Sequence, residues 1–194
     1  LNGQEQIVMF KNSNIDFAYN LKLLGEHQIK NSAIVCQTAL LLREKDSRIN
    51  INTIKNGLSK TLWPGRFEIM KEKPLIIIDG AHNLAGARML SKSLKKYYPD
   101  KKRVFLLGIL KDKDVEGIID ELVMQNDYVV VTEPDSDRAA NAQYVAEKVK
   151  AEIVYSISDS SIALNKALSL MKEDSLLCVA GSLYLIGKIR KILQ

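Results

Sequence analysis

From about residue 75 onward, hydrophobic and polar positions follow two patterns in turn. Short apolar runs predict strands, and longer amphipathic stretches between them predict helices. The predicted strands are residues 75–79, 104–107, 128–131, 153–157 and 176–180. The predicted helices are residues 84–98, 115–125, 139–150, 160–172 and 183–193. Strict alternation of this kind indicates an α/β fold, in which a mostly parallel sheet is covered by helices on both faces.

The chain before residue 64 has a different pattern. Two strands and two helices are predicted there, at residues 6–10, 17–24, 32–43 and 52–59. Asn31 or Ser32 is suited to cap the first of these helices. That helix is apolar nearly all round, so we expect it to be buried. The segment is too short for a complete core of its own and resembles the tail of another domain.

A proline and a glycine interrupt the pattern in Trp63-Pro64-Gly65-Arg66-Phe67-Glu68. Such residues mark turns and linkers. We therefore expect a first unit at residues 1–63, a linker at residues 64–73 and a second unit at residues 74–194.

Composition narrows the function classes. The net charge of +5 comes from scattered lysines, and aromatic residues are only 6% of the chain, which disfavours a nucleic-acid-binding protein. No apolar run approaches the roughly 20 residues that a membrane helix needs. Cys36 and Cys178 lie in apolar runs and read as small buried side chains. The two cysteines and two histidines do not have the spacing of a zinc site. Because the cysteines give no sign of a disulfide framework, the expected compartment is the cytoplasm.

Polar residues follow the first predicted strand of the second unit directly. Asp79 and His82 should lie at the carboxyl edge of the sheet, where α/β proteins bind ligands. The following helix offers free N–H groups that favour anions. The alternative is that Asp79 only caps the turn and His82 is a solvated loop residue.

The sequence does not match the known phosphate-binding motifs. The spacing after Gly80 does not match a dinucleotide-binding G-x-G-x-x-G sequence. The segment from Gly181 to Lys188 has one residue too many for a P-loop, and Ile189 replaces the hydroxyl that would hold magnesium. A Ser-His-Asp triad has little support from two histidines.

A set of polar residues in predicted turns remains, comprising Asn31, Arg66, Asp79, His82 and Ser182. An arginine can bind phosphate with two hydrogen bonds, a carboxylate can accept from ribose hydroxyls, and an amide suits an adenine edge. The alternatives are an ion pair of Arg66 with Glu68 and a plain helix cap for Asn31.

Five segments in order resemble the folylpolyglutamate synthase and dihydrofolate synthase family, a branch of the Mur ligase superfamily. They are Leu24-Gly25-Glu26-His27-Gln28-Ile29-Lys30-Asn31, Trp63-Pro64-Gly65-Arg66-Phe67-Glu68, Asp79-Gly80-Ala81-His82-Asn83, Gly108-Ile109-Leu110-Lys111-Asp112-Lys113-Asp114 and Ala180-Gly181-Ser182-Leu183-Tyr184. The resemblance implies a Rossmann-like glutamate-binding domain at residues 74–194, preceded by the C-terminal part of a central ATP-binding domain. It also implies a monomer.

The resemblance further implies an ATP-dependent ligase. ATP phosphorylates a folate carboxylate, and the amine of L-glutamate attacks the acyl phosphate. By position, Asn31 would contact adenine, Arg66 the phosphates and Asp79 the ribose. His82 and Ser182 would lie near the incoming glutamate, with His82 as the catalytic residue.

The family's P-loop, Mg²⁺ ligands and most of its folate pocket would lie upstream of Leu1, so we expect this chain to be an incomplete fragment that is inactive alone. A peptidoglycan Mur ligase is an alternative with the same fold and chemistry. A non-catalytic module that binds a nucleotide or an amino acid is a second alternative.

Overall fold

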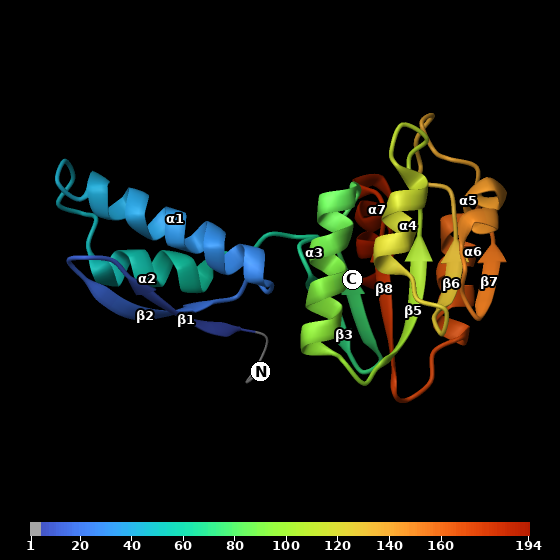
Figure 1. Ribbon diagram of the computed structural model, residues 1–194, viewed down its shortest axis with the longest axis horizontal. Helices are drawn as coiled ribbons and strands as arrows, with labels where there is room; N and C mark the ends of the chain where they lie inside the picture. The colour runs from blue at the N-terminus through green and yellow to red at the C-terminus, as the bar shows by residue number, and fades with distance from the viewer. Residues whose placement is uncertain (1–4) are drawn as a thin grey trace. The chain divides into compact units, whose positions relative to one another are not determined.

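The computed structural model describes residues 5–194 and divides into two compact units, Leu1–Pro64 and Gly65–Gln194 (Figure 1). The first four residues of the expected first unit therefore lie outside the part that the structure describes. Each unit has its own apolar core.

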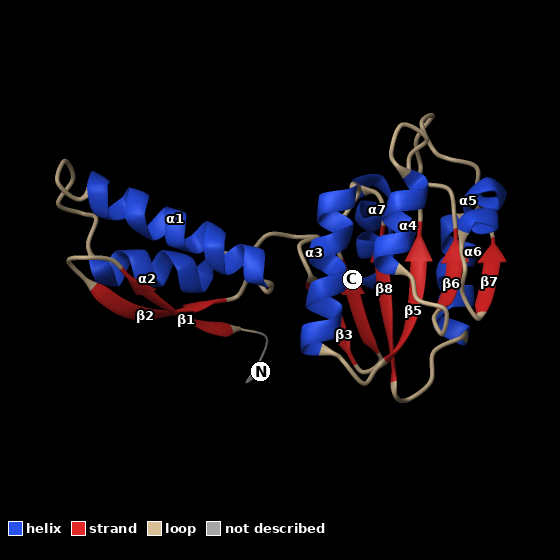
Figure 2. Cartoon of the chain, viewed as in Figure 1, coloured by secondary structure: helices blue, strands red, loops and turns tan. Residues whose placement is uncertain are grey.

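The first unit pairs a β-hairpin with two helices. Strands β1 (Gln6–Lys11) and β2 (Asp16–Leu21) are antiparallel, and helices α1 (Glu26–Leu42) and α2 (Ile51–Lys60) complete the unit (Figure 2). Alternate strand residues point into one core, as a half-buried hairpin requires. That core contains Val8, Phe10, Phe17, Tyr19, Leu21, Cys36, Ile54 and Leu58.

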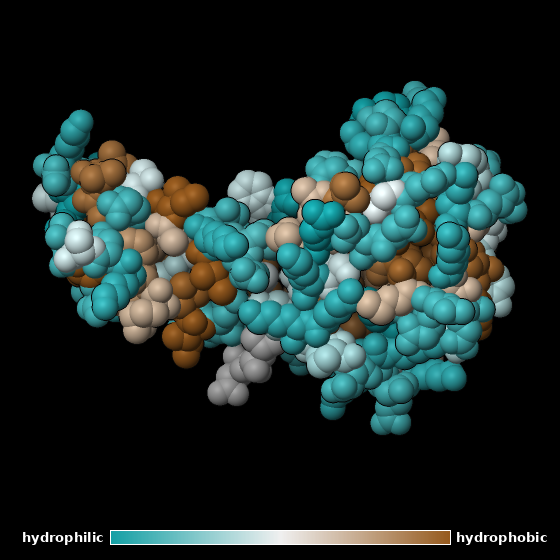
Figure 3. All heavy atoms as spheres, viewed as in Figure 1, coloured by the Kyte–Doolittle hydropathy of each residue, from teal (hydrophilic) through white to brown (hydrophobic). Residues whose placement is uncertain are grey.

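Helix α1 differs from its prediction in two ways. It begins at Glu26, so Asn31 is an interior helical residue and not a cap. Burial of the whole helix is also wrong, because only one face packs against the hairpin. Ile34 and Leu41 are 66% and 60% exposed, and Figure 3 shows apolar side chains at the surface of this unit.

The second unit is built on a six-stranded sheet in the order β3-β4-β8-β5-β6-β7. Its strands are β3 (Glu68–Glu72), β4 (Leu75–Ile78), β5 (Lys102–Leu107), β6 (Tyr128–Val131), β7 (Ile153–Ser156) and β8 (Ser175–Ala180). Its helices are α3 (Leu84–Tyr97), α4 (Val115–Leu122), α5 (Ala142–Lys148), α6 (Ser160–Ser169) and α7 (Leu183–Leu193). Five strands are mutually parallel, which confirms the predicted fold class.

The helices form two layers around the sheet. Helices α3, α4 and α5 cover one face, and α6 and α7 cover the other (Figure 2). Strand residues therefore meet apolar side chains on both sides, and β8 is buried along its whole length. Against α6 and α7 the core includes Ile76, Ile78, Leu106, Val130, Val179 and Leu185.

The expected linker contains a strand. Glu68–Glu72 forms β3, which pairs antiparallel with β4 at the edge of the sheet, so residues 65–73 belong to the second unit. A register irregularity between Ile69 and Lys71 breaks the two-residue alternation by which strands are predicted. For this reason the hydrophobic pattern of the segment did not indicate a strand.

A buried ion pair lies near the amino ends of β5 and β6. Arg103 donates two hydrogen bonds to the carboxylate of Asp127, at 2.9 and 2.6 Å. The backbone N–H of Met124 donates to the same carboxylate at 2.7 Å. With 7% and 2% of the Arg103 and Asp127 side chains exposed, the pair is closed to solvent and serves the fold.

Candidate functional site

The turn after β4 is organised by Asp79. One carboxylate oxygen accepts from the Ala81 N–H at 2.7 Å, and the other accepts from the Phe67 N–H at 2.8 Å. Phe67 has a φ of 46°, which is rare for a large side chain, and its ring packs against Tyr97 and Tyr98. Asp79 therefore ties the segment before β3 to the turn after β4.

The carboxyl group of Asp79 is buried. Burial raises its pKa, and the hydrogen bonds from Phe67 and Ala81, together with the charges of Arg66 and His82, offset part of that rise. Desolvation disfavours a carboxylate, whereas donors and nearby cations favour it. The structure thus gives Asp79 the turn-holding role that the sequence left as an alternative.

His82 leaves the same turn and lies half-buried. Its Nδ1 is 2.7 Å from the carbonyl oxygen of Gly80. Because a carbonyl oxygen only accepts, Nδ1 carries a hydrogen, and in the neutral ring Nε2 is left as an acceptor. The hydrogen bond fixes both the ring orientation and the tautomer.

Arg66 is exposed beside this turn. The expected alternative, an ion pair with Glu68, is wrong because other groups bind that carboxylate. Arg190 lies 3.1 Å from it, and the Gly65 N–H donates to it at 2.7 Å. Burial still dominates and raises the pKa of Asp79, but the positive charge of Arg66 offsets part of that rise, so Arg66 acts on the carboxyl edge of the sheet.

Ser182 begins helix α7 at the end of β8. It is 1% exposed, and its Oγ accepts from the Tyr184 N–H at 3.1 Å. The preceding Gly181 has a φ of 104° and donates to the carbonyl of Ala81 at 2.9 Å, which joins this turn to that of His82. A serine hydroxyl also has one hydrogen to donate, in addition to the lone pair used in this bond.

Asn31 belongs to the other unit. It lies on the exposed surface of α1, where its amide Nδ2 donates to Gln28 Oε1 at 3.3 Å. Of the five predicted site residues, the structure brings Arg66, Asp79, His82 and Ser182 to one sheet edge.

A cavity of about 460 Å³ opens at this edge. His82 and Ser182 both line it, as the sequence predicted for one binding site. The other lining residues are Leu110, Lys113, Arg138, Leu183 and Tyr184. The sequence pattern indicated no role for Lys113 or Arg138. Their signal was weak because lysine and arginine in loops are common on protein surfaces.

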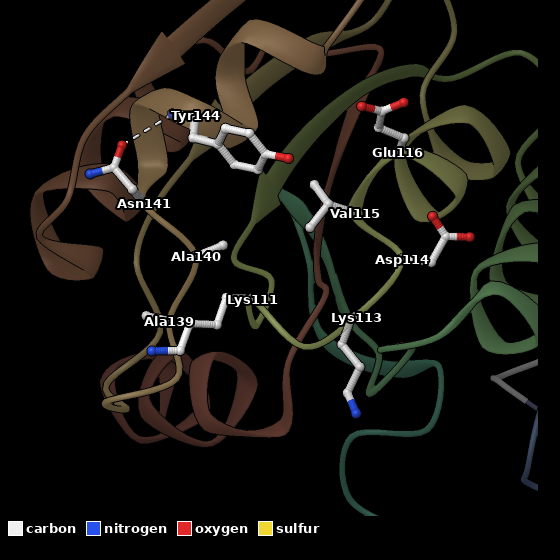
Figure 4. A pocket seen from close by; sticks show the side chains of 9 residues that line it. All are labelled: Lys111, Lys113, Asp114, Val115, Glu116, Ala139, Ala140, Asn141 and Tyr144. Atoms are coloured by element: carbon white, nitrogen blue, oxygen red, sulfur yellow. Dashed lines mark hydrogen bonds between the residues drawn. The ribbon is translucent and has the colours of Figure 1, made fainter.

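A second cavity of about 570 Å³ lies next along the edge (Figure 4). Its lining mixes both charge signs, with Lys111 and Lys113 on one loop and Asp114 and Glu116 beyond them. Figure 4 shows the Lys111 and Lys113 side chains leaving that loop in different directions, so the two lysines do not form a single cationic cluster. The first cavity is the better candidate site, because it contains His82 and Ser182.

Residues 5–194 offer neither a metal-binding cluster nor a membrane-spanning helix. No three His, Cys, Asp or Glu side chains of this range gather closely enough to hold a metal ion. No helix within it is both long and apolar enough to span a bilayer.

Comparison with known proteins places this geometry in a family. Residues 65–183 match the family described as Mur ligase, glutamate ligase domain. The chain is 32% identical over 174 residues to the folylpolyglutamate synthase of Lacticaseibacillus casei, covering 88% of this chain and 39% of that protein. The folylpolyglutamate synthase structure from Thermotoga maritima is 27% identical with a TM-score of 0.77, and the match covers 99% of this chain and 47% of that one.

A third comparison concerns a nucleotide complex. A bifunctional folylpolyglutamate synthase/dihydrofolate synthase from Yersinia pestis, complexed with AMPPNP and Mn ion, is 28% identical with a TM-score of 0.65, over 75% of this chain and 35% of that one. The chain thus spans less than half the length of each of these three relatives. With a family match over more than half of its residues, this chain belongs to the Mur ligase family and contains the glutamate ligase domain.

Proposed function

We propose that this chain is part of an ATP-dependent ligase that adds L-glutamate to a folate, which is dihydropteroate, tetrahydrofolate or both. The observation that carries the proposal is the cavity at the carboxyl edge of the sheet, where His82, Ser182 and two cationic side chains converge. An amino acid with two carboxylates fits such a lining. The folylpolyglutamate synthases among its relatives support the acceptor class.

The proposed reaction has two steps. The γ-phosphoryl group of ATP passes to a folate carboxylate, which yields ADP and an acyl phosphate. The glutamate amine then attacks the acyl carbon, its proton is lost, and phosphate leaves as the amide forms. Such chemistry depends on positioned groups that stabilise the developing charge.

The residues of the second unit have distinct roles in this proposal. Arg66 binds the phosphates, since its guanidinium is exposed and is not engaged by Glu68. Asp79 holds the turn and accepts from the ribose. His82 uses Nε2 to orient the attacking amine and receive its proton, and Ser182 donates to a glutamate carboxylate.

The first unit has one proposed contact, from Asn31 to adenine, which its exposed amide allows. A divalent ion accompanies the nucleotide in the Yersinia pestis relative. We propose Mg²⁺ as the divalent ion of the longer protein, with its ligands outside residues 5–194, where no three His, Cys, Asp or Glu side chains gather closely enough to hold a metal ion. A monomer in the cytoplasm completes the proposal.

The deciding experiment measures phosphate release by a protein that carries this chain behind an ATP-binding domain. ATP, Mg²⁺ and L-glutamate are supplied, and the acceptor is varied. Release that depends on dihydropteroate or tetrahydrofolate supports the proposal. Release only with a muramyl acceptor would assign a peptidoglycan ligase instead. A folded, ATP-binding protein that releases no phosphate with any acceptor would indicate a non-catalytic binding module.

Two variants test the residue roles in the same assay. Arg66→Ala should lower turnover by about two orders of magnitude, as loss of a preorganised charge does, while the melting temperature stays near that of the wild type. His82→Ala should raise the KM for glutamate. A glutamate KM unchanged by His82→Ala would exclude that residue from the glutamate site. The 194-residue chain alone should release no phosphate.

A further inference from the structure

Glu68 follows Arg66 by two residues and is the nearest acid to it in the sequence. An acid at this spacing is able to bind the guanidinium that the proposed reaction uses for the phosphates. We propose that Arg190 of α7 is a positioning residue, which binds the Glu68 carboxylate and thereby keeps Arg66 free for the nucleotide. This inference rests on the proposed function, because that proposal gives the phosphates to Arg66.

Both oxygens of the Glu68 carboxylate are bound by groups other than Arg66. Arg190 Nε donates to Oε1 at 3.1 Å and to Oε2 at 3.2 Å, and Arg190 Nη2 lies 3.1 Å from Oε1. The Gly65 N–H donates to Oε2 at 2.7 Å. Only 23% of the Glu68 side chain and 32% of the Arg190 side chain are exposed, so the pair is partly shielded from water. Charge-assisted pairs of an arginine with a carboxylate are among the stronger polar contacts in proteins.

Packing of α7 brings Arg190 to this carboxylate. Leu183, Ile186 and Arg190 are spaced by three and four residues, so they lie along one face of the helix. That face lies close to the turn. A Cβ added at Gly65 would be 2.6 Å from Ile186 Cδ1, and one added at Gly80 would be 2.7 Å from Leu183 Cδ2. Apolar contacts that do not depend on the ion pair therefore hold Arg190 beside its acid.

The backbone on both sides of Arg66 is also fixed. The Gly65 carbonyl accepts from the Gly80 N–H at 2.7 Å. The Phe67 N–H donates to the Asp79 carboxylate at 2.8 Å. Neither bond involves α7, so loss of a guanidinium on that helix should change the partner of a side chain and not the path of the chain.

Two arginines thus lie near one acid. In the wild type Arg190 neutralises Glu68, and Arg66 keeps a positive charge that this acid does not cancel. Without Arg190, the partly buried carboxylate would keep the Gly65 N–H as a donor but no cation. A charge in such a place is unfavourable without a partner, so the carboxylate would bind Arg66 instead. A guanidinium bound in this way has to leave its acid before it can bind phosphate, which should lower turnover about tenfold.

The first test follows the Arg66 side chain directly, by NMR of the arginine Nε–H groups in the full 194-residue chain. Arg66→Lys assigns the signal. In the wild type this hydrogen should exchange quickly with water, because the side chain is exposed. In Arg190→Gln it should exchange about threefold more slowly, since a partly exposed ion pair with Glu68 protects it modestly. An Arg66 exchange rate unchanged by Arg190→Gln would overturn the inference.

Glu68→Gln separates a change of partner from a general loss of structure. A glutamine at this position can still accept from the Gly65 N–H, but it offers no charge to Arg66. The double variant Glu68→Gln/Arg190→Gln should therefore return the Arg66 exchange rate to that of the wild type, although it lacks the ion pair. Exchange that stays slow in the double variant would contradict the proposal.

Turnover of the longer protein, measured as phosphate release, gives the second test. Arg190→Gln should lower turnover about tenfold, and the double variant should restore it to within about twofold of the wild type. In an Arg66→Ala background, Arg190→Gln should have no further effect, because a residue that acts only through Arg66 has no influence once that guanidinium is gone. A further tenfold loss in that background would refute a positioning role.

Arg88→Gln is the matched control. Arg88 of α3 also binds an acid with two nitrogens, since its Nε and Nη2 lie 3.0 and 2.7 Å from Glu121 of α4. The substitution removes the same charge from the same kind of pair, and both Arg66 exchange and turnover should equal those of the wild type. Slower Arg66 exchange in this variant would overturn the inference, because loss of any positive charge would then be sufficient.

The two tests separate this inference from the proposed ligase function. Slower Arg66 exchange in Arg190→Gln, restored by Glu68→Gln, would support the control of Arg66 by Arg190 even if the longer protein released no phosphate, a result that would refute the ligase function alone. Acceptor-dependent phosphate release combined with unchanged Arg66 exchange in Arg190→Gln would refute only the inference.

Discussion

The two edges of the six-stranded sheet use the same kinds of charged residue in opposite ways. Near the amino ends of the strands, Arg103 and Asp127 bind each other with two hydrogen bonds and are almost wholly buried. At the carboxyl edge, Arg138 and Lys113 line an open cavity. The Arg138 guanidinium lies 3.7 Å from the Asp112 carboxylate, which is longer than a hydrogen bond.

The two kinds of charged residue differ in how much they contribute to the stability of the fold. A buried pair is fully compensated within the protein, so removal of one partner leaves an isolated charge and destabilises the fold. A cation that faces a cavity remains available to a ligand and contributes little to folding. The comparison therefore separates a buried charge pair that stabilises the fold at one edge from cations that face a cavity at the other.

The largest effect is expected at the amino edge. Asp127→Asn should lower the free energy of unfolding by about 3–5 kcal/mol, because Arg103 would keep its charge in a buried site without a counter-charge. Urea unfolding followed by circular dichroism measures this loss. Glu152→Gln is the matched control, since the Lys102–Glu152 pair nearby is exposed. Similar losses in the two variants would contradict the contrast between buried and exposed pairs.

The next effect concerns Gly181 at the carboxyl edge. A Cβ at this position would lie 2.7 Å from the carbonyl oxygen of Gly108, and the φ of 104° disfavours any side chain. Gly181→Ala should cost about 1–2 kcal/mol from the backbone alone and displace the loop after β5. Thermal unfolding measures the loss of stability. A titration with L-glutamate measures whether the displaced loop affects ligand binding.

Gly187 in the same helix region gives the control for that substitution. No atom lies within 4 Å of a Cβ built there, so Gly187→Ala should raise stability by about 0.5–1 kcal/mol. A stabilised Gly181→Ala variant would show that the turn tolerates a side chain.

A further effect is a change of the free energy of unfolding with pH. Burial raises the pKa of Asp79 above its ordinary value of 3.8, so the folded state favours the protonated carboxyl more than the unfolded state does. The resulting stabilisation is complete below about pH 4 and is lost as pH rises through the folded-state pKa. Across that window the wild type should lose up to about 1.4 kcal/mol per pH unit relative to Asp79→Asn. Parallel stability curves for the two proteins would exclude Asp79 as the titrating group.

Much of the second unit follows from periodicity. Four of the five apolar runs are strands buried along most of their length, β4, β5, β6 and β8, because a strand covered on both faces needs apolar side chains at successive positions. The fifth run is the more exposed edge strand β7. β3 was missed, since its irregular register removes the alternation that marks a half-buried strand. The start of α1 was placed six residues late, because Asn31 and Ser32 look like caps while Gly25, the actual N-cap, offers no side chain.

The site could be predicted only in part. The sequence predicts Asp79, His82 and Ser182 in turns that follow strands, and in the structure these turns end neighbouring parallel strands. The positions of Lys113 and Arg138 depend on a contact between two loops that are far apart in sequence, and no local pattern encodes it. The partner of Glu68 was missed for the same reason, since Arg190 lies 122 residues away.

The bridge between Leu110 and Ala139 also bears on how amino-acid preference could be changed. It joins the segments 108–114 and 133–141 into one structural unit. Inserting or deleting residues in one segment alone would break the backbone hydrogen bonds that it makes with the other. Redesign toward a neutral or a basic amino acid would need both segments to be transplanted together, while the strands beneath them stay untouched.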